Sequence, residues 1–236
     1  MYLNLKKIKM IAFDWDGTLV NSLDEVVIAF QSACKDFSIP VPDTQSVRKN
    51  IGMGHEEIWE KLSHLMGEKI KTPNRKEFWE CFYNYYQPEN VKVFDSVRRS
   101  LDTIINHGLA VAIVTNKPSF SFFPEVDDLD LRTYFIDCLC ADQYIEKPDP
   151  MMLSVLSARH NLTPENILMV GDTTFDIDAA NAFGCQSVAV LCGNMKESEL
   201  AISSPTLMIN HVGELAEYIE KEHPLVEDIV FEEEYA

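Results

Sequence analysis

Two aspartates separated by one residue follow an apolar run near the start of the chain. Asp14 and Asp16 come directly after residues 8–13, and Gly17 follows them. In an extended segment, residues two apart point to the same side, and a glycine lets the backbone approach a ligand closely. Such a carboxylate pair can bind Mg²⁺ together with a substrate phosphate, and one carboxylate can attack phosphorus while the other protonates the leaving oxygen. A surface turn without function has the same spacing.

Two further segments can bind a phosphate group. Thr115 and Asn116 follow the apolar residues 109–114 and can donate hydrogen bonds to phosphoryl oxygens. Lys147 precedes two closely spaced prolines, which restrict the backbone and can hold the ammonium over a phosphate. Taken alone, Thr115 and Asn116 are better explained as caps of the next helix. Lys147 taken alone is equally suited to a surface position before a helix.

A second pair of aspartates lies in the last third of the chain. Asp172 and Asp176 follow the apolar residues 167–170, and a spacing of four places both on one face of a helical turn. Two carboxylates there can complete a cation site. The alternative is that Asp172 or Thr173 only caps the helix that follows.

Buried strands and intervening helices are predicted to position these residues. Apolar runs typical of buried strands cover residues 8–13, 109–114, 137–140, 167–170, 187–191 and 207–209. Strand alternating with helix predicts an α/β fold with a doubly wound, parallel, Rossmann-like sheet. Ligands bind such sheets beyond the carboxyl ends of the strands, so Asp14, Thr115 and Asp172 are expected to converge. The four motifs follow the four best strand candidates in chain order, which unrelated surface features would rarely do.

One long segment interrupts the alternation of strands and helices. Residues 22–87 contain helical patterns and no strand pattern, which predicts an inserted module of about four helices. The expected domains are a discontinuous core of residues 1–20 and 92–236 and a helical domain of residues 21–91.

Composition excludes several classes of protein. The 236 residues carry a formal charge of −18, which argues against binding to a nucleic-acid backbone. No window approaches the roughly 20 apolar residues of a membrane helix. The six cysteines show neither a disulfide framework nor zinc-ligand spacing, so we expect reduced thiols in a cytoplasmic protein.

Together the motifs resemble the haloacid dehalogenase superfamily, in particular its phosphoglycolate phosphatase-like branch. The resemblance rests on residues 13–20 (Phe-Asp-Trp-Asp-Gly-Thr-Leu-Val), Thr-Asn-Lys at 115–117, Lys-Pro at 147–148 and Gly-Asp-Thr-x-x-Asp at 171–176. It spans nearly the whole chain. It implies that the helical insertion is the family's mobile cap.

The resemblance assigns the chemistry to the first motif. It implies that Asp14 is the nucleophile that forms an aspartyl-phosphate. Asp16 is implied to protonate the leaving group and then to activate water as a base. Asp16 also separates the sequence from the dehalogenase members, which resemble it in fold but lack this second carboxylate.

The other motifs are implied to bind the phosphoryl group. Thr115, Asn116 and the amides near Gly17 would bind its oxygens. Lys147 would neutralise charge on the phosphoryl group and on Asp14.

A metal site is implied as well. The resemblance places Mg²⁺ among Asp14, the backbone carbonyl of Asp16 and Asp172. Asp176 is implied to orient these ligands.

Within the insertion, residues 52–54 (Gly-Met-Gly) resemble the loop with which the family's cap recognises the leaving group. His55, which follows directly, and Arg48 are therefore candidate substrate contacts. A plain turn between helices with a solvent-facing His55 is an equally good interpretation.

The sequence therefore predicts a Mg²⁺-dependent phosphatase that hydrolyses a small phosphorylated metabolite, either a phosphoglycolate-like ester or a sugar phosphate. One alternative is a phosphomutase of the same superfamily. Another is a non-catalytic binding or regulatory protein that meets a partner through the acidic run at 232–234. The oligomeric state stays open, a homodimer included.

Overall fold

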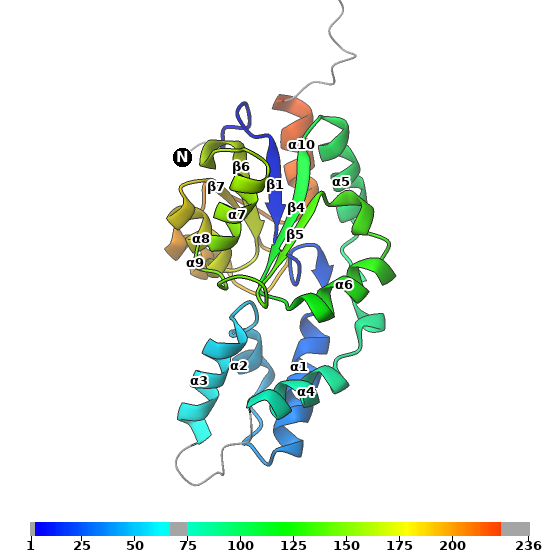
Figure 1. Ribbon diagram of the computed structural model, residues 1–236, viewed down its shortest axis with the longest axis vertical. Helices are drawn as coiled ribbons and strands as arrows, with labels where there is room; N and C mark the ends of the chain where they lie inside the picture. The colour runs from blue at the N-terminus through cyan, green and yellow to red at the C-terminus, as the bar shows by residue number, and fades with distance from the viewer. Residues whose placement is uncertain (1–2, 67–74, 223–236) are drawn as a thin grey trace, which may run out of the picture.

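The structure is a computed structural model that describes residues 3–66 and 75–222. The acidic run at 232–234 lies outside the described residues. A body built around a β-sheet stands at one end of the molecule and a group of helices at the other (Figure 1). Among the described residues, no helix is both long and apolar enough to cross a membrane.

The sheet has six parallel strands in the order β5-β4-β1-β6-β7-β8. They are β1 (Met10–Phe13), β4 (Ala110–Thr115), β5 (Asp137–Cys140), β6 (Ile167–Gly171), β7 (Gln186–Val190) and β8 (Leu207–Ile209). All six correspond to apolar runs predicted to be strands, with small shifts at their ends. The doubly wound parallel sheet expected from the alternation of strands and helices is therefore present.

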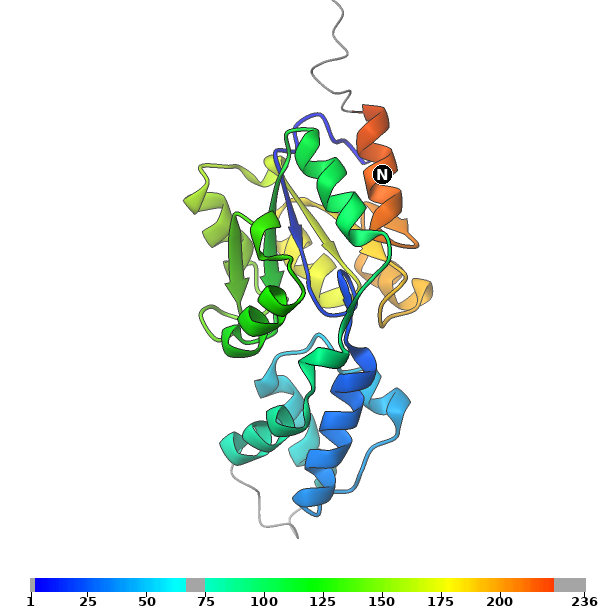
Figure 2. The same cartoon turned by 90° about the vertical axis from the view of Figure 1, so that its right-hand side faces the viewer.

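Helices cover both faces of the sheet, as the side-chain alternation along β1 illustrates. Ile11 and Phe13 pack in one apolar cluster with α5 (Val97–Asn106) and α10 (Val212–Glu222), which lie side by side (Figures 1 and 2). Met10 and Ala12 pack in a second cluster with α7 (Met151–Arg159) and α8 (Thr174–Phe183). Successive strand residues point to opposite faces. Both faces are buried, which explains why the strands read as continuous apolar runs.

The predicted helical insertion contains α1 (Leu23–Asp36), α2 (Thr44–Arg48), α3 (His55–Met66) and α4 (Arg75–Tyr85). These helices lie together below the carboxyl ends of the sheet strands in Figure 1. Helices α1 and α4 pack against each other through aromatic rings, with Phe30 and Phe78 in an edge-to-face contact at 5.6 Å. Edge-to-face geometry is favourable for aromatic pairs.

The two chain segments that connect the sheet body to these helices run side by side. Strands β2 (Val20–Asn21) and β3 (Lys92–Val93) form a short antiparallel pair at this crossing. The sequence did not predict this pair, because two-residue strands have no readable periodicity. The remaining elements are α6 (Ser119–Asp128), α9 (Glu197–Leu200) and 3₁₀ turns at Pro88–Asn90, Arg132–Tyr134, Pro164–Asn166 and Ala201–Ser203.

Candidate active site

Three predicted site residues meet at the carboxyl edge of the central strands. Asp14 follows β1, Thr115 ends β4 and Asp172 follows β6, and all three side chains are buried. Strand β1 pairs with β4 on one side and β6 on the other, and the Asp14 amide donates to the Val170 carbonyl at 2.9 Å. The parallel register therefore brings side chains from three distant parts of the chain to one place.

A buried acidic cluster forms at this edge. One carboxylate oxygen each of Asp14, Asp172 and Asp176 lies within 4.8 Å of the other two. Burial raises the pKa of Asp14 to about 6 even though Lys147 lies beside it. Burial, together with the charges of Asp14 and Asp176, also raises the pKa of Asp172 well above its usual range. Three carboxylates in so small a buried volume are the donor set of a hard cation.

The ammonium of Lys147 provides a positive charge inside this acidic cluster. Its Nζ atom donates to Asp14 at 2.8 Å, to Asp176 at 2.6 Å and to the Val114 carbonyl at 2.8 Å. Burial alone lowers the pKa of Lys147, but the two carboxylates outweigh burial and raise that pKa above its ordinary value. With one ammonium and three carboxylates, the cluster retains an excess of negative charge that a divalent cation would offset.

The start of helix α8 fixes Asp176. Thr173 is the residue before the first helical turn, and its backbone amide and hydroxyl donate to Asp176 Oδ2 at 3.0 and 2.7 Å. The capping role considered for Asp172 or Thr173 therefore falls to Thr173 and Asp176. Asp172 instead accepts hydrogen bonds from the Asn194 amide at 2.8 Å and the Thr18 hydroxyl at 3.2 Å.

Two glycines let the chain close around Asp172. Gly17 has a φ of +84°, and a Cβ atom there would lie 2.4 Å from Asp172 Oδ2. A Cβ atom at Gly193 would lie 2.2 Å from the same oxygen. No other residue type leaves room for the carboxylate between these two loops.

Asp16 faces away from the acidic cluster. Its Oδ1 atom accepts hydrogen bonds from the Ser22 hydroxyl at 2.6 Å and from Lys117 Nζ at 3.0 Å. The Asp16 side chain is 18% exposed and lines a cavity. Two donors therefore hold one carboxylate oxygen next to open space.

Lys117 connects Asp16 to a buried polar network. Its ammonium also donates to the Tyr86 hydroxyl at 2.8 Å and lies 3.1 Å from Glu125. Glu125 is fully buried in α6 and accepts hydrogen bonds from Trp15 Nε1 at 2.5 Å and the Tyr86 hydroxyl at 2.7 Å. Burial raises the pKa of Glu125. Tyr86 directly follows α4, so this network ties the sheet body to the helical group.

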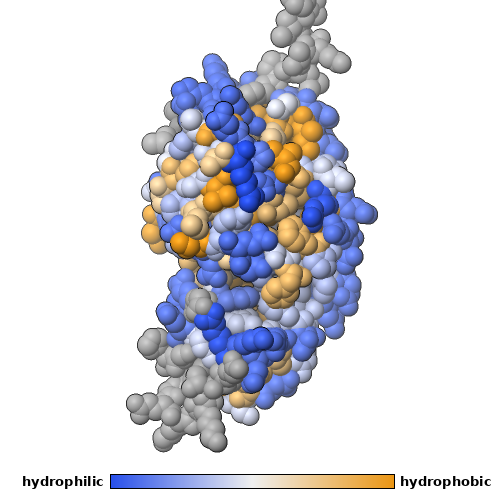
Figure 3. Space-filling model, viewed as in Figure 1, coloured by the Kyte–Doolittle hydropathy of each residue, from blue (hydrophilic) through white to orange (hydrophobic). Residues whose placement is uncertain are grey.

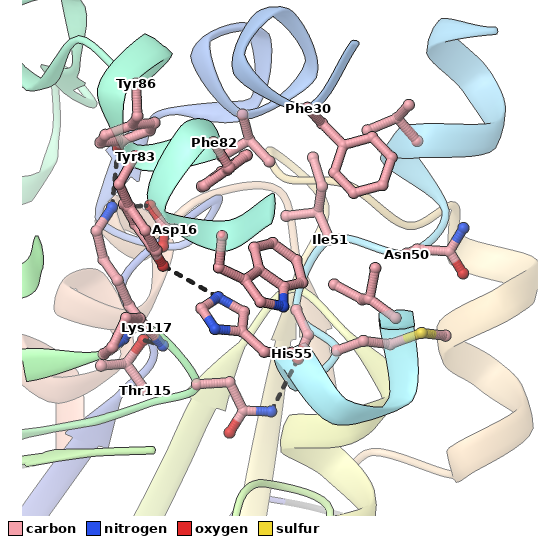
Figure 4. A pocket seen from close by; sticks show the side chains of 18 of the residues that line it. Asp16, Phe30, Asn50, Ile51, His55, Phe82, Tyr83, Tyr86, Thr115 and Lys117 are labelled. Atoms are coloured by element: carbon pink, nitrogen blue, oxygen red, sulfur yellow. Dashed lines mark hydrogen bonds and ion pairs between the residues drawn. The ribbon is translucent and has the colours of Figure 1, made fainter. Parts of the chain in front are cut away.

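The cavity beside Asp14 and Asp16 measures about 140 Å³. Asp16, Thr115 and Lys117 lie along one side of it, whereas Phe30 and Ile51 lie opposite (Figure 4). The cavity therefore has a polar side next to the acidic cluster and a mainly apolar side formed by the helical group. On the outer surface of the molecule, by contrast, hydrophobic residues are scattered among hydrophilic ones (Figure 3).

The predicted cap contacts lie in different places. His55 lines the cavity, stacks on Trp79 at 3.9 Å between ring centroids, and is hydrogen-bonded to Tyr83 at 3.0 Å. It is therefore not the freely solvated histidine of the alternative interpretation. Arg48 does not line the cavity, and its guanidinium pairs with Asp24 on α1. Its role as a substrate contact stays a prediction.

The side chain of Asn116 forms hydrogen bonds within the protein. Its Nδ2 atom donates to the carbonyls of Gly52 and Lys147, both at 2.9 Å, and its Oδ1 atom accepts from the Lys147 amide at 2.8 Å. The side chain thus joins the end of β4 to the loop before α3 and fixes the backbone of Lys147. Its predicted contact to a phosphoryl group is not tested by these bonds.

Several residues around the site were given no role from the sequence. Lys117, Glu125 and Tyr86 belong to the network at Asp16, and Asn194 binds Asp172. Glu125 lies between Pro124 and Val126, next to the aromatic residues of α6, and this apolar context was a detectable signal. Asn194 follows β7 closely, so the strand-end argument used for Asp172 applies to it as well.

Comparison with known proteins agrees with this geometry. A family model described as haloacid dehalogenase-like hydrolase matches residues 11–190. A phosphoglycolate phosphatase of Vibrio parahaemolyticus is 30% identical over 221 residues, which cover 90% of this chain and 96% of that protein. A phosphoglycolate phosphatase of Vibrio vulnificus strain CMCP6 is 31% identical over 222 residues, which cover 91% of this chain and 97% of that protein. A crystal structure described as a predicted phosphoglycolate phosphatase from Haemophilus somnus superposes with a TM-score of 0.81 at 27% identity, covering 91% of this chain and 99% of that one. The chain therefore belongs to the haloacid dehalogenase-like hydrolase family, as an enzyme of its phosphoglycolate phosphatase-like branch.

Proposed function

We propose that the protein is a Mg²⁺-dependent phosphatase that hydrolyses small phosphorylated metabolites through an aspartyl-phosphate on Asp14. The observation that carries this proposal is the buried cluster of Asp14, Asp172, Asp176 and Lys147 next to a cavity that Asp16 also lines. The six cysteines are free thiols, as expected in the reducing cytoplasm where we propose that the enzyme acts.

Asp14 and Asp16 divide the chemistry between them. A carboxylate oxygen of Asp14 forms a bond to phosphorus while the bond from phosphorus to the alcohol oxygen breaks, and Asp16 gives that oxygen a proton. Asp16 then takes a proton from water as the water oxygen attacks phosphorus, which releases phosphate and restores Asp14. Lys147 holds the Asp14 carboxylate in place, and Thr115 offers a hydroxyl to the phosphoryl group.

The acidic cluster fits Mg²⁺. Asp14, Asp172 and the backbone carbonyl of Asp16 would hold the ion, and Asp176 would keep Lys147 beside them. When bound, the ion supplies positive charge for the phosphoryl oxygens and the nucleophile. Asn194 and Thr18 orient Asp172 for this role through the hydrogen bonds that they donate.

We also propose that residues 21–91 form a cap domain that moves relative to a core of residues 1–20 and 92–236. The supporting observation is that α1 to α4 join the sheet body through two crossing segments, β2 and β3. Closure of such a cap would exclude bulk water while the aspartyl-phosphate forms.

The first experiment measures phosphate release from an aryl phosphate with Mg²⁺ and with excess EDTA. Release of alcohol and inorganic phosphate in equal amounts, only with Mg²⁺, is the expected result. Conversion of a sugar phosphate into its isomer without free phosphate would indicate the phosphomutase alternative. Absence of turnover with every member of a broad panel would favour the non-catalytic alternative.

Asp172→Asn tests the metal site without relying on turnover. In EDTA, the variant is expected to be at least as stable as wild type, because it removes a buried carboxylate whose pKa burial and its neighbours raise. A raised carboxylate pKa in the folded state means that the ionised form destabilises the fold above the unfolded pKa, and Asn relieves this effect. Mg²⁺ should raise the melting temperature of wild type and leave that of the variant unchanged. Hydrolysis is expected to fall roughly 100-fold.

The matched control for this test is Asp178→Asn. Asp178 is exposed on α8, the helix that carries Asp176. This variant should keep both the Mg²⁺-induced stabilisation and the rate. Equal stabilisation of Asp172→Asn and wild type by Mg²⁺ would contradict the assigned metal site.

Glu125→Gln tests the network that positions Asp16. The substitution leaves Lys117 with one carboxylate partner, Asp16, so the ammonium and Asp16 are expected to settle in a different arrangement. We expect kcat to fall roughly tenfold with little change in KM, since general acid–base catalysis contributes on the order of 10²–10⁴-fold and Asp16 is displaced rather than lost. Steady-state kinetics of the variant check this result. Asp127→Asn on the same helix is the control, and a Glu125→Gln variant with wild-type kcat would contradict the role.

A further inference from the structure

The cavity wall that faces the leaving group is mainly apolar. In the proposed reaction the phosphoryl group lies at Asp14, and the alcohol extends past Asp16 into the cavity. The walls there include Val26, Phe30, Val47, Ile51, Trp79 and Phe82. Ser46 and Asn50 also line the cavity, but the Ser46 hydroxyl donates to Asp43 and the Asn50 amide donates to the Ser46 carbonyl. Figure 4 shows Phe30 and Ile51 on the side of the cavity away from Thr115.

The ammonium groups that line the cavity are already neutralised. Lys117 lies between Asp16 and Glu125, at 3.0 and 3.1 Å. Lys61 is 3.2 Å from Glu57, and its side chain is 47% exposed. Arg75 lines a neighbouring groove rather than this cavity. Each lysine in the described lining therefore has an acidic partner within the protein.

His55 adds no charge at neutral pH. Burial, reinforced by the nearby Arg75, lowers the pKa of His55 to about 4. Its ring stacks on Trp79 at 3.9 Å and is hydrogen-bonded to the Tyr83 hydroxyl (Figure 4). The imidazole is thus an uncharged part of the wall.

One buried donor in the wall lacks an acceptor. Trp79 is 8% exposed, and none of the described residues accepts a hydrogen bond from its Nε1 atom. Buried indole N–H groups usually have a hydrogen-bond partner. An uncharged oxygen on a bound ligand would satisfy this donor.

We propose that the alcohol part of the substrate is uncharged and mainly apolar, with an oxygen that accepts a hydrogen bond from Trp79. This inference rests on the proposed phosphatase function and narrows its substrate class. The curated relatives are named for phosphoglycolate, whose leaving group carries a carboxylate. In this chain such a carboxylate would enter an apolar cavity whose lysines are paired, and burial of an unpaired charge is strongly unfavourable.

The first test compares kcat/KM for phosphoglycolate and isobutyl phosphate in the presence of Mg²⁺. Isobutyl phosphate carries an isopropyl group where phosphoglycolate carries its carboxylate. We expect isobutyl phosphate to be preferred at least about a hundredfold, since unpaired polar groups in a binding site give discrimination of this size or more. Equal use of the two esters, or a preference for phosphoglycolate, would overturn the proposal.

A matched pair of variants tests the charge argument directly. Val26→Lys adds an ammonium at a partly exposed position of the cavity wall, and Ile28→Lys adds one at an exposed position of the same helix outside the lining. Val26→Lys should shift the ratio of kcat/KM values toward phosphoglycolate at least tenfold. Ile28→Lys should leave the ratio unchanged. An equal effect of both variants would contradict a role of the cavity wall in selecting charge.

A second pair of esters tests the Trp79 donor. Tetrahydrofurfuryl phosphate carries a ring oxygen that cyclopentylmethyl phosphate, its all-carbon counterpart, lacks. Trp79→Phe retains an aromatic ring and removes the N–H group. We expect it to lower kcat/KM roughly tenfold for the first ester and to leave the second unchanged, because a lost hydrogen bond to an uncharged group changes binding by about this factor. An equal change for both esters would refute the hydrogen bond.

Binding measurements separate this inference from the proposed function. If no ester in the panel is hydrolysed, the phosphatase proposal fails. Calorimetric titration of the Mg²⁺-loaded protein with isobutylphosphonate and phosphonoacetate then decides the cavity's preference without turnover. Tighter binding of isobutylphosphonate supports the inference, and tighter or equal binding of phosphonoacetate overturns it.

Discussion

Replacement of Asp14 by Asn is expected to abolish phosphate ester hydrolysis without unfolding the protein. Asn has the same shape as Asp but cannot form the phosphoryl intermediate, and loss of a nucleophile lowers kcat by roughly 10⁴- to 10⁶-fold. Lys147 keeps its contacts to Asp176 and to the Val114 carbonyl, so the buried ammonium retains a carboxylate partner. Burial also raises the pKa of Asp14, so the fold does not depend on its negative charge.

Two measurements check this prediction. Phosphate release is compared between wild type, Asp14→Asn and the exposed control Asp178→Asn, with circular dichroism to verify that each variant is folded. Acid-quenched wild-type protein is then examined by mass spectrometry for a phosphoryl group on Asp14. Residual turnover of Asp14→Asn at more than a few per cent of wild type would contradict the role of Asp14 as the nucleophile. A phosphoryl adduct on another residue would contradict it as well.

Lys147→Met is expected to be the most destabilising single substitution at the site. The ammonium is buried between Asp14 and Asp176, and its removal leaves the acidic cluster without the cation that it contains. Removing one partner of a buried ion pair costs about 3–5 kcal/mol of unfolding free energy. Urea denaturation in EDTA measures this loss, and hydrolysis should be lost along with it.

Acidification should reduce the loss of unfolding free energy that Lys147→Met causes. Burial raises the pKa of Asp14 to about 6 even in the presence of Lys147, and without the ammonium that pKa is expected to rise further. Up to about pH 6 the folded wild type and the folded variant both keep Asp14 largely protonated, so the extra loss of stability in the variant should be small there and should grow as the pH rises from about 6 toward the higher pKa of the variant. Lys7→Met removes an exposed ion pair with Glu165 and should cost less than about 1 kcal/mol. A pH-independent loss would contradict the electrostatic explanation.

The sheet could be predicted because its strands are buried on both faces. Predominantly apolar runs of four to six residues marked β1, β4, β5 and β6, and the alternation with helices indicated parallel pairing. The same reasoning placed Asp14, Thr115 and Asp172 at one edge of the sheet. These features depend on local sequence and on topology rules that hold for the whole fold class.

The surroundings of Asp16 could not be predicted in the same way. They depend on Glu125 from α6 and on Tyr86 from the segment after α4, which reach Lys117 only once the helices have packed. No spacing in the sequence connects these residues. The pairing of Arg48 with Asp24 likewise depends on how α1 and α2 pack. From the sequence alone, Arg48 was a candidate substrate contact.

The position of β1 also has a consequence for biosynthesis. Met10 pairs with Ala110 on one side and with Ile167 on the other, so β1 leaves the ribosome long before either of its partner strands. Its four residues are wholly apolar, and exposed strands of this kind aggregate readily. The interval before β4 emerges is therefore the stage at which the nascent chain is most open to aggregation through β1. Because Asp14 directly follows β1, the proposed nucleophile is synthesised early but acquires its surroundings only when β6 and Asp172 have been added.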